Sequence, residues 1–129
     1  MARVLVVDDN DLVRRALELA LTRMGHDVTS VSSSVTALET AVAKQPDLAV
    51  LDYGMPVMNG AALLVEMRRI LGDRCPKIVF ISGALQDEIR AKTLSLGAHG
   101  YVTKPFHLAE LRRAVDDALG SVPRALSSG

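Results

Sequence analysis

The chain has 129 residues and no formal net charge, because 15 basic side chains balance 15 acidic ones. This length fits a single domain around one core, and the lack of a positive field argues against direct binding to nucleic acid or to a membrane. The only cysteine, Cys75, rules out an internal disulfide framework, and the apolar run around Leu5 is too short for a secretory or transmembrane segment. We therefore expect a cytoplasmic protein.

Short apolar runs alternate along the chain with segments of helical period, which predicts βα units and a parallel sheet. In chain order we expect strand 3–7, helix 11–24, strand 27–31, helix 34–44, strand 47–51, helix 60–71, strand 77–81, helix 86–96, strand 100–102 and a last helix from about residue 108. Gly25 and Gly97 are stop signals for the first and fourth helices, and Pro46 ends the second. The fold class is therefore α/β.

The apolar positions of the helices predict which faces pack on the sheet. In the first helix these positions are Leu12, Val13, Ala16, Leu17, Ala20, Leu21 and Met24, and in the last they are Leu108, Leu111, Val115 and Leu119. The second helix is expected to carry Leu38 and Val42 inward. The fourth has little more than Ile89 and Leu94 to anchor it, so we expect a loosely held element that can move.

The end of the chain differs from the rest. Residues 121–129 have no period and are typical of a linker or a free tail. We therefore assign residues 1–120 to the domain and residues 121–129 to a tail or linker stub.

Polar side chains gather at the ends of the predicted strands. Asp8 and Asp9 close the first apolar run, Asp52 closes the third, Ser82 closes the fourth, and Lys104 follows the fifth. The carboxyl ends of parallel strands meet at one edge of an open sheet, which is where such sheets hold ligands. We therefore expect all five groups to lie together.

Three neighbouring carboxylates repel one another by a few kcal/mol per pair at about 4 Å and an effective dielectric near 20. A hard divalent cation such as Mg²⁺ suits all-oxygen ligands and leaves room for a phosphate oxygen. With Lys104 as a second cation, the arrangement favours phosphoryl transfer, which depends on placement and on neutralised charge. Asp52 is then the nucleophile that becomes an aspartyl phosphate.

Each of these residues also has an ordinary structural interpretation. Asp9, Asn10 and Asp11 are good N-cap residues for the first helix, and alone they favour capping over metal binding. Ser82 followed by glycine is typical of a turn, and a lysine before proline is commonly a solvated surface residue. The expected meeting of all five groups at one edge favours the site.

Four segments together resemble the receiver domain of bacterial two-component response regulators, in particular the chemotaxis regulators. They are 6–10 (VVDDN), 52–60 (DYGMPVMNG), 80–83 (FISG) and 97–106 (GAHGYVTKPF), and the resemblance covers residues 2–120. It implies a flavodoxin-like doubly wound fold, in which a five-stranded parallel sheet of order 2-1-3-4-5 has helices on both faces.

The resemblance also implies residue roles. Asp52 would take a phosphoryl group from the phosphohistidine of a sensor histidine kinase or a histidine phosphotransfer protein. Asp8, Asp9, Asp52 and the Gly54 carbonyl would hold Mg²⁺, and Lys104 and Ser82 would contact the phosphate oxygens. The peptide bond from Lys104 to Pro105 would be cis.

A switch follows from the same resemblance. Phosphate on Asp52 would attract the Ser82 hydroxyl, and Tyr101 would fold inward, which changes the surface of helix four, strand five and helix five toward an output partner or domain. Without the resemblance, a half-buried aromatic residue on a short edge strand is the better interpretation of Tyr101.

The chain departs from the family pattern at two places. Gly54, two residues after Asp52, and Ala84, two residues after Ser82, are small and non-polar. We therefore expect water to reach the acyl phosphate without a side chain to orient it. His99 and Gly100 replace a pair of aspartates found in one DNA-binding subgroup, so the homodimer contacts of that subgroup cannot be carried over and dimerisation stays open.

Two other functions are compatible with parts of the pattern. A Mg²⁺-dependent phosphohydrolase with an aspartyl nucleophile would usually carry a second acid where Gly54 stands. A receiver-like interaction module that takes no phosphate is disfavoured by the complete set of site residues. We expect a signalling receiver, not a turnover enzyme, and the sequence does not decide between a stand-alone relay and the N-terminal part of a longer regulator.

Overall fold

The computed structural model describes residues 2–83 and 87–120. They form a parallel five-stranded sheet in the order β2-β1-β3-β4-β5, which confirms the predicted topology. The strands are β1 (Arg3–Val7), β2 (Asp27–Val31), β3 (Leu48–Asp52), β4 (Lys77–Ser82) and β5 (Gly100–Thr103). The helices are α1 (Asp11–Arg23), α2 (Ser34–Lys44), α3 (Gly60–Leu71), α4 (Asp87–Ser95) and α5 (Leu108–Gly120), with a short 3₁₀ helix, η1 (Gly72–Arg74).

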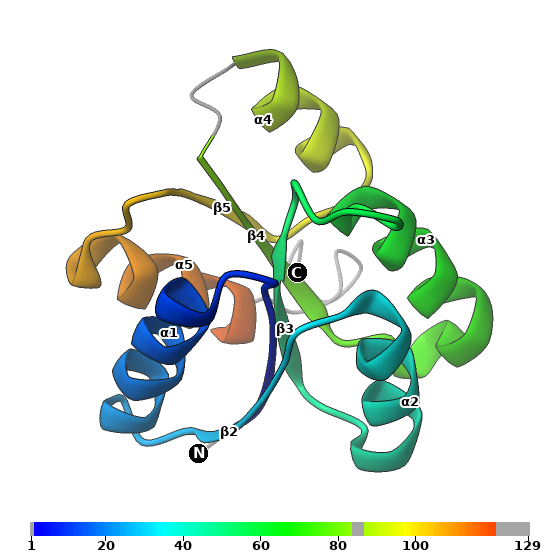
Figure 1. Ribbon diagram of the computed structural model, residues 1–129, viewed down its shortest axis with the longest axis horizontal. Coiled ribbons are helices and arrows are strands. Elements are labelled where there is room, and N and C mark those ends of the chain that lie inside the picture. Colours follow the sequence, from blue (N-terminus) through cyan, green and yellow to red (C-terminus); the bar gives the residue numbers. More distant parts are fainter. Residues whose placement is uncertain (1, 84–86, 121–129) are drawn as a thin grey trace, which may run out of the picture.

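Helices cover both faces of the sheet, with α1 and α5 on one side and α2 and α3 on the other (Figure 1). In β1, Val4 and Val6 point into the core beneath α1 and α5, while Leu5 and Val7 point into the core beneath α2 and α3. Successive side chains of a strand face opposite sides, so a strand covered on both faces is apolar throughout. This explains the uninterrupted apolar runs of the sequence.

Side-chain hydrogen bonds begin three of the helices. Asn10 accepts from the Val13 amide at 3.0 Å, Ser33 from the Thr36 amide at 3.2 Å, and Asn59 from the Ala62 amide at 2.9 Å. These contacts satisfy amides that have no partner inside the helix. Some of the polar residues in the loops of this chain therefore stabilise the starts of helices.

The inward faces of three helices differ in part from the predicted ones. Leu12 is 82% exposed, Ala16 is also exposed, and Leu108 is 61% exposed. Leu12 and Leu108 lie in the first turn of their helices, before close contact with the sheet begins. In α2 the prediction for Val42 was wrong, because Ala37 and Ala41 form the buried face and Val42, one residue further, is turned to solvent.

The part of helix α4 whose side chains the structure describes gives little apolar anchoring, and Ile89, the other expected anchor, lies outside that part. In its described part Thr93 is buried and Leu94 is half exposed. Its C-terminal end is held by hydrogen bonds instead, since the Arg68 guanidinium of α3 donates to the carbonyls of Leu96 and Gly97. A contact from α3 therefore restrains one end of the helix, and the expected looseness of α4 stays a prediction.

Within residues 2–83 and 87–120, every helix is too short or too polar to span a lipid bilayer.

Candidate functional site

The topology brings the predicted site residues to the carboxyl edge of the sheet. Asp8 follows β1 directly, Asp52 and Ser82 are the last residues of β3 and β4, and Lys104 follows β5. The loop between β1 and α1 carries Asp9. Because β1 lies beside β3, residues far apart in sequence become neighbours at the point where the strand order reverses.

The three carboxylates form one cluster. Asp8, Asp9 and Asp52 each offer an oxygen, and these oxygens lie within 4.8 Å of one another. Asp8 and Asp52 are buried, whereas Asp9 is exposed. A ligand approaching from solvent would thus meet Asp9 first and two enclosed carboxylates behind it.

Lys104 provides a positive charge between the two buried acids. Its Nζ lies 3.0 Å from Asp8 Oδ2 and 3.3 Å from Asp52 Oδ1. The Lys104 amide donates to the Ser82 carbonyl at 2.8 Å, and the bond from Lys104 to Pro105 is cis, as the resemblance implied. The backbone of the loop after β5 is therefore tied to β4 where the ammonium reaches the acids.

Burial and charge change the acidity of these groups. Burial raises the pKa of Asp52, the neighbouring Asp8 raises it further, and Lys104 lowers it in part. Burial opposes the charge of Lys104, but the ion pair with Asp8 and the attraction of both carboxylates raise its pKa overall. Asp52 is an acid whose ionised form is disfavoured in the absence of a further cation.

The donor set fits a hard divalent cation. The buried Asp8 Oδ2 has no aligned hydrogen-bond donor within the described structure, although Lys104 is close enough for an ion pair. Its other oxygen accepts from the Asn10 amide at 2.9 Å, and Asp52 Oδ1 accepts from the Gly54 amide at 3.2 Å. A cluster of oxygen ligands with one unsatisfied buried oxygen is the chemistry that Mg²⁺ prefers.

The structure separates capping from acid chemistry in the loop before α1. Asn10 is the residue whose side chain caps α1, so Asp9 is not needed for that purpose. Asp11 pairs instead with Arg14, which also donates to the Asp8 carbonyl. Asp9 is thereby left to the carboxylate cluster.

Ser82 and Tyr101 occupy neighbouring strands. Ser82 is buried, while Tyr101 is half-buried and packs against the core beneath α2 and α3.

Gly54 is exposed with open space around its α-carbon, whereas Ala84 lies outside the described residues.

Sequence reasoning missed the role of Gly60. A Cβ atom built on Gly60 would lie 2.7 Å from the Asp52 carbonyl oxygen and 2.8 Å from the Phe80 ring. Gly60 also donates its amide to the Tyr53 carbonyl at 3.1 Å. The glycine thus lets the start of α3 approach the end of β3, and only its place near Asp52 in the sequence hinted at this.

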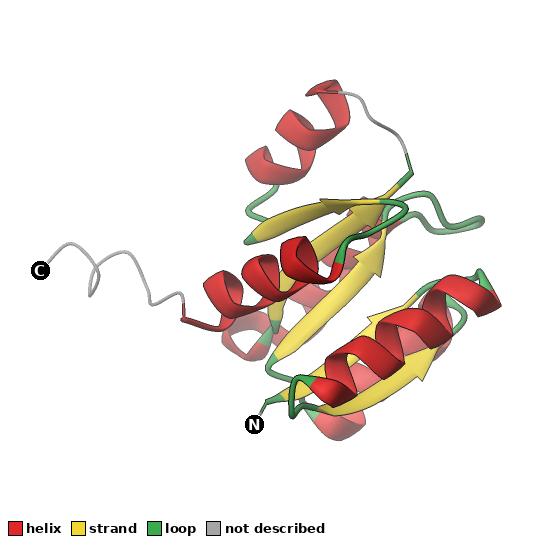
Figure 2. Cartoon of the chain, turned by 90° about the vertical axis from the view of Figure 1, so that its left-hand side faces the viewer, coloured by secondary structure: helices red, strands yellow, loops and turns green. Residues whose placement is uncertain are grey.

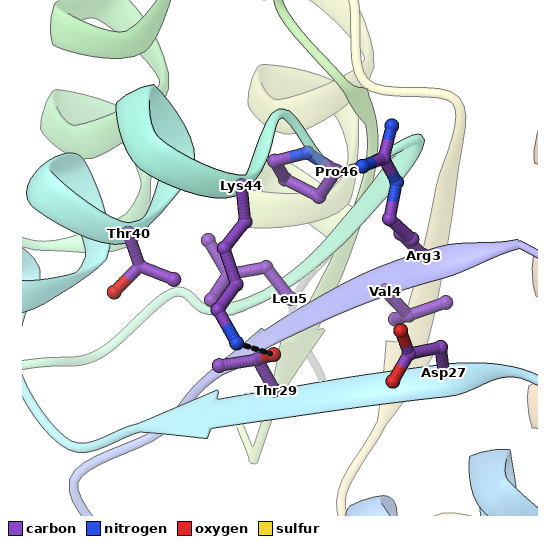
Figure 3. Close-up of a pocket in the computed structure, with 8 residues that line it drawn as sticks. All are labelled: Arg3, Val4, Leu5, Asp27, Thr29, Thr40, Lys44 and Pro46. Carbon is purple, nitrogen blue, oxygen red and sulfur yellow. Dashed lines mark hydrogen bonds between the residues drawn. The ribbon is translucent and has the colours of Figure 1, made fainter.

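A small pocket lies at the opposite edge of the sheet, between α2 and the first two strands (Figure 3). Its volume is about 20 Å³, and Lys44 reaches across it to donate to Thr29 Oγ1 at 3.3 Å. This space holds about one water molecule. It is remote from the carboxylate cluster and adds nothing to it.

The fold and the site together define a class: a flavodoxin-like α/β domain with a carboxylate triad and a lysine at the point where the strand order reverses. Residues 4–116 match the model of the response regulator receiver domain. The chain belongs to this family, and the matched region is a receiver domain rather than a turnover enzyme.

Two regulators illustrate the similarity in sequence. The transcriptional regulatory protein KdpE of Mycobacterium tuberculosis is 37% identical over 119 residues, which are 89% of this chain and 51% of that protein. Regulatory protein AtoC of Escherichia coli is 37% identical over 117 residues, which are 91% of this chain and 25% of that protein. The chain therefore spans about half, or less, of the length of these two relatives.

Solved structures agree with this assignment. The chemotaxis protein CheY4 of Vibrio cholerae has a TM-score of 0.84 and 26% identity, covering 92% of this chain and 98% of that one. The receiver domain of the sensor histidine kinase PA1611 of Pseudomonas aeruginosa has a TM-score of 0.82 and 28% identity, with 93% and 98% covered. That receiver domain was crystallised with a magnesium ion coordinated in its active site cleft.

Proposed function

We propose that Asp52 accepts a phosphoryl group from the phosphohistidine of a sensor histidine kinase or a histidine phosphotransfer protein. The observation that carries the proposal is the position of Lys104, whose ammonium lies 3.0 Å from Asp8 and 3.3 Å from Asp52 inside a cluster of three carboxylates. We place the reaction in the cytoplasm, as expected from the sequence.

In the proposed reaction a carboxylate oxygen of Asp52 attacks phosphorus. The bond between phosphorus and the histidine nitrogen breaks, the nitrogen keeps the electron pair, and the carboxylate becomes an acyl phosphate. Lys104 balances charge on the phosphoryl oxygens, and the buried position of Asp52 limits competing hydrogen bonds from water.

We propose that Asp8, Asp9, Asp52 and the Gly54 carbonyl hold a Mg²⁺ ion. When bound, the ion neutralises negative charge shared by the carboxylates and the incoming phosphate. The unsatisfied Asp8 oxygen and the magnesium reported for the Pseudomonas receiver domain support this assignment. Removing the ion is expected to abolish phosphorylation, because Asp52 would then face Asp8 with only Lys104 to offset the repulsion.

We further propose that phosphorylation acts through Ser82 and Tyr101. The Ser82 hydroxyl would bond a phosphate oxygen, and Tyr101 would turn inward and change the surface of α4, β5 and α5. The exposure of Leu94 in the described part of α4 supports this proposal, because a small change in local charge can more easily shift a helix with few apolar contacts. The surface would control an output partner, or an output domain after residue 120 in a longer regulator.

The test is direct phosphorylation of the purified chain. A small phosphodonor such as phosphoramidate should add one phosphoryl group to the intact mass when Mg²⁺ is present. Neither the Asp52→Asn variant nor the chain in EDTA should gain it. A label that persists in Asp52→Asn would refute the proposal.

The same experiment separates the competing functions. Steady release of inorganic phosphate over many turnovers would indicate a phosphohydrolase, and a chain that never takes the label would indicate an interaction module. A receiver should instead gain one phosphoryl group and lose it slowly.

A further inference from the structure

Three side chains accept backbone amides at the edge of the sheet where the strands begin, opposite the carboxylate cluster. They belong to residues just before β2, β3 and β5, and the contacts are His26 Nδ1 with the Ala2 amide at 3.2 Å, Asp47 Oδ2 with the Arg3 amide at 2.8 Å and His99 Nδ1 with the Ile78 amide at 3.1 Å. Figure 2 shows that the strands run in one direction and that the loop leaving α4 enters β5 at this edge. His99 therefore lies in the turn that joins α4 to β5.

The His99 ring takes the place of a strand carbonyl as a hydrogen-bond acceptor. The His99 amide donates to the Ile78 carbonyl at 2.7 Å, and regular pairing of β4 with β5 starts one residue later, at Val79 and Gly100. Ile78 is completely buried, and its amide donates to the imidazole. Since an amide nitrogen only donates, Nδ1 must carry a lone pair, and the neutral ring has its proton on Nε2. An imidazolium has a proton on both nitrogens and cannot accept this bond.

The charged side chains that act on His99 are cations. Burial of part of the ring lowers the pKa of His99, and Lys77 of β4 and Arg68 of α3 lower it further. Within the described part of the chain, no carboxylate lies within ion-pair distance of His99. Protonation of the ring therefore adds a third positive charge to this region without an anion to balance it.

The described side chains of the neighbouring elements add no anion at the ring. Burial raises the pKa of Cys75, in the loop before β4, so its thiol stays neutral in acid. The described charged side chains of α4, Arg90 and Lys92, are exposed cations. Helix α5 covers the opposite face, because Gly100 lies against α5 and the preceding residue of an extended chain points the other way.

We propose that His99 is a pH-sensitive latch, which holds the turn between α4 and β5 against β4 at neutral pH and releases it in mild acid. His99 is exposed, so a proton from solvent can reach the ring and bind to Nδ1. No covalent bond breaks in this step, but the Ile78 amide loses its acceptor. A buried amide without an acceptor destabilises the closed turn, and repulsion from Lys77 and Arg68 acts in the same direction.

The latch itself does not depend on the proposed phosphorylation of Asp52. Its effect on signalling rests on the proposed function, because the turn lies between α4 and Tyr101, two parts of the surface that phosphorylation is proposed to change. The contact of Asp47 with the Arg3 amide shows that an oxygen atom can fill the same place at this edge. A purely structural contact therefore does not need an imidazole, whereas a contact that responds to mild acid does.

The test compares the native chain with His99→Asn by NMR-detected hydrogen exchange at pH 7 and pH 5. Asparagine keeps an acceptor oxygen close to the position of Nδ1 but does not titrate. In the native chain the protection factor of the Ile78 amide, corrected for the intrinsic exchange rate at each pH, should fall by about tenfold between pH 7 and pH 5. In His99→Asn it should be the same at both pH values. The matched control is His26→Asn, which makes the same change at the contact before β2 and should keep the fall at Ile78.

A second measurement uses the native chain alone, so it does not depend on how well a variant folds. The NMR shifts of the His99 ring and of the Ile78 amide should change with pH at one shared midpoint, below pH 6.5. Different midpoints, an Ile78 protection factor that does not fall, or an equal fall in His99→Asn would overturn the proposal. A fall that His26→Asn removes would also overturn it, by assigning the effect to His26.

Discussion

Replacing Asp52 by asparagine is expected to stabilise the metal-free chain at neutral pH. Asp52 is buried beside a second buried acid, with oxygens within 4.8 Å, which corresponds to about 3.5 kcal/mol of repulsion at an effective dielectric near 20. Lys104 at 3.3 Å offsets this by about 5 kcal/mol. Burial of the charge is the largest cause of the raised pKa and costs several kcal/mol for an enclosed ion.

The burial penalty therefore outweighs the small excess of attraction over repulsion. We expect Asp52→Asn to raise the free energy of unfolding by on the order of 2 kcal/mol in EDTA. Because the pKa of Asp52 is raised in the folded chain, the cost of its charge is present above the folded-state pKa. It disappears as the pH falls to the ordinary value of 3.8.

The assay is urea unfolding of the native chain and of Asp52→Asn in EDTA between pH 7 and pH 4. Asp73→Asn is the control, because it removes an exposed carboxylate. Adding Mg²⁺ should narrow or reverse the difference, because a ligand at a hundred times its Kd stabilises the native state by about 2.7 kcal/mol. An Asp52→Asn variant that is less stable than the native chain at pH 7, or equally stabilised at pH 7 and pH 4, would refute the reasoning.

Three further outcomes follow from the geometry. Gly54→Asn should fit without a clash, since no atom lies within 4 Å of the position of its Cβ. The asparagine side chain should orient water and so hasten loss of the acyl phosphate several-fold. An unchanged decay rate of the phosphorylated chain, measured by intact mass, would discard this idea. Arg68→Met should increase the rate of amide hydrogen exchange at the C-terminal end of α4 by about tenfold. This corresponds to a loss of about 1.4 kcal/mol of hydrogen bonding to the carbonyls there. The control variant Arg69→Met, at an exposed position, should leave the exchange rate unchanged. Burial, Lys77 and Arg68 lower the pKa of His99, whose ring accepts from the Ile78 amide at 3.1 Å. The contribution of neutral His99 to stability is therefore full above pH 6.5 and is lost as the pH falls through the lower folded-state pKa. In the Asp52→Asn background, His99→Gln should therefore reduce the fall of the urea unfolding midpoint with decreasing pH below 6.5. A midpoint that falls as steeply as before would argue against this.

Much of the fold could be predicted because its signals are local. The order and type of the elements follow from apolar runs such as Leu48–Asp52, each followed by loop residues and a segment of helical period. These signals do not depend on distant parts of the chain. The placement of the site residues at strand ends is also local, and with parallel strands it already implies one shared edge.

Other features depend on contacts between residues far apart in the sequence. Nothing near Arg68 indicates that it binds the carbonyls at the end of α4, and nothing near Gly60 indicates the close approach to the Asp52 carbonyl. The exposure of Leu12 and Leu108 likewise depends on where each helix meets the sheet.

The sequence by itself therefore determined the class of fold, the order of the elements and which residues lie at the carboxyl edge. Only the tertiary structure decided the distances from Lys104 to the two buried acids, the unsatisfied oxygen of Asp8 and the close approach of Gly60 to the end of β3. The physical reason is that periodicity and turn residues act within a few positions of the chain. Burial, charge pairing and grooves arise from the packing of whole elements against one another.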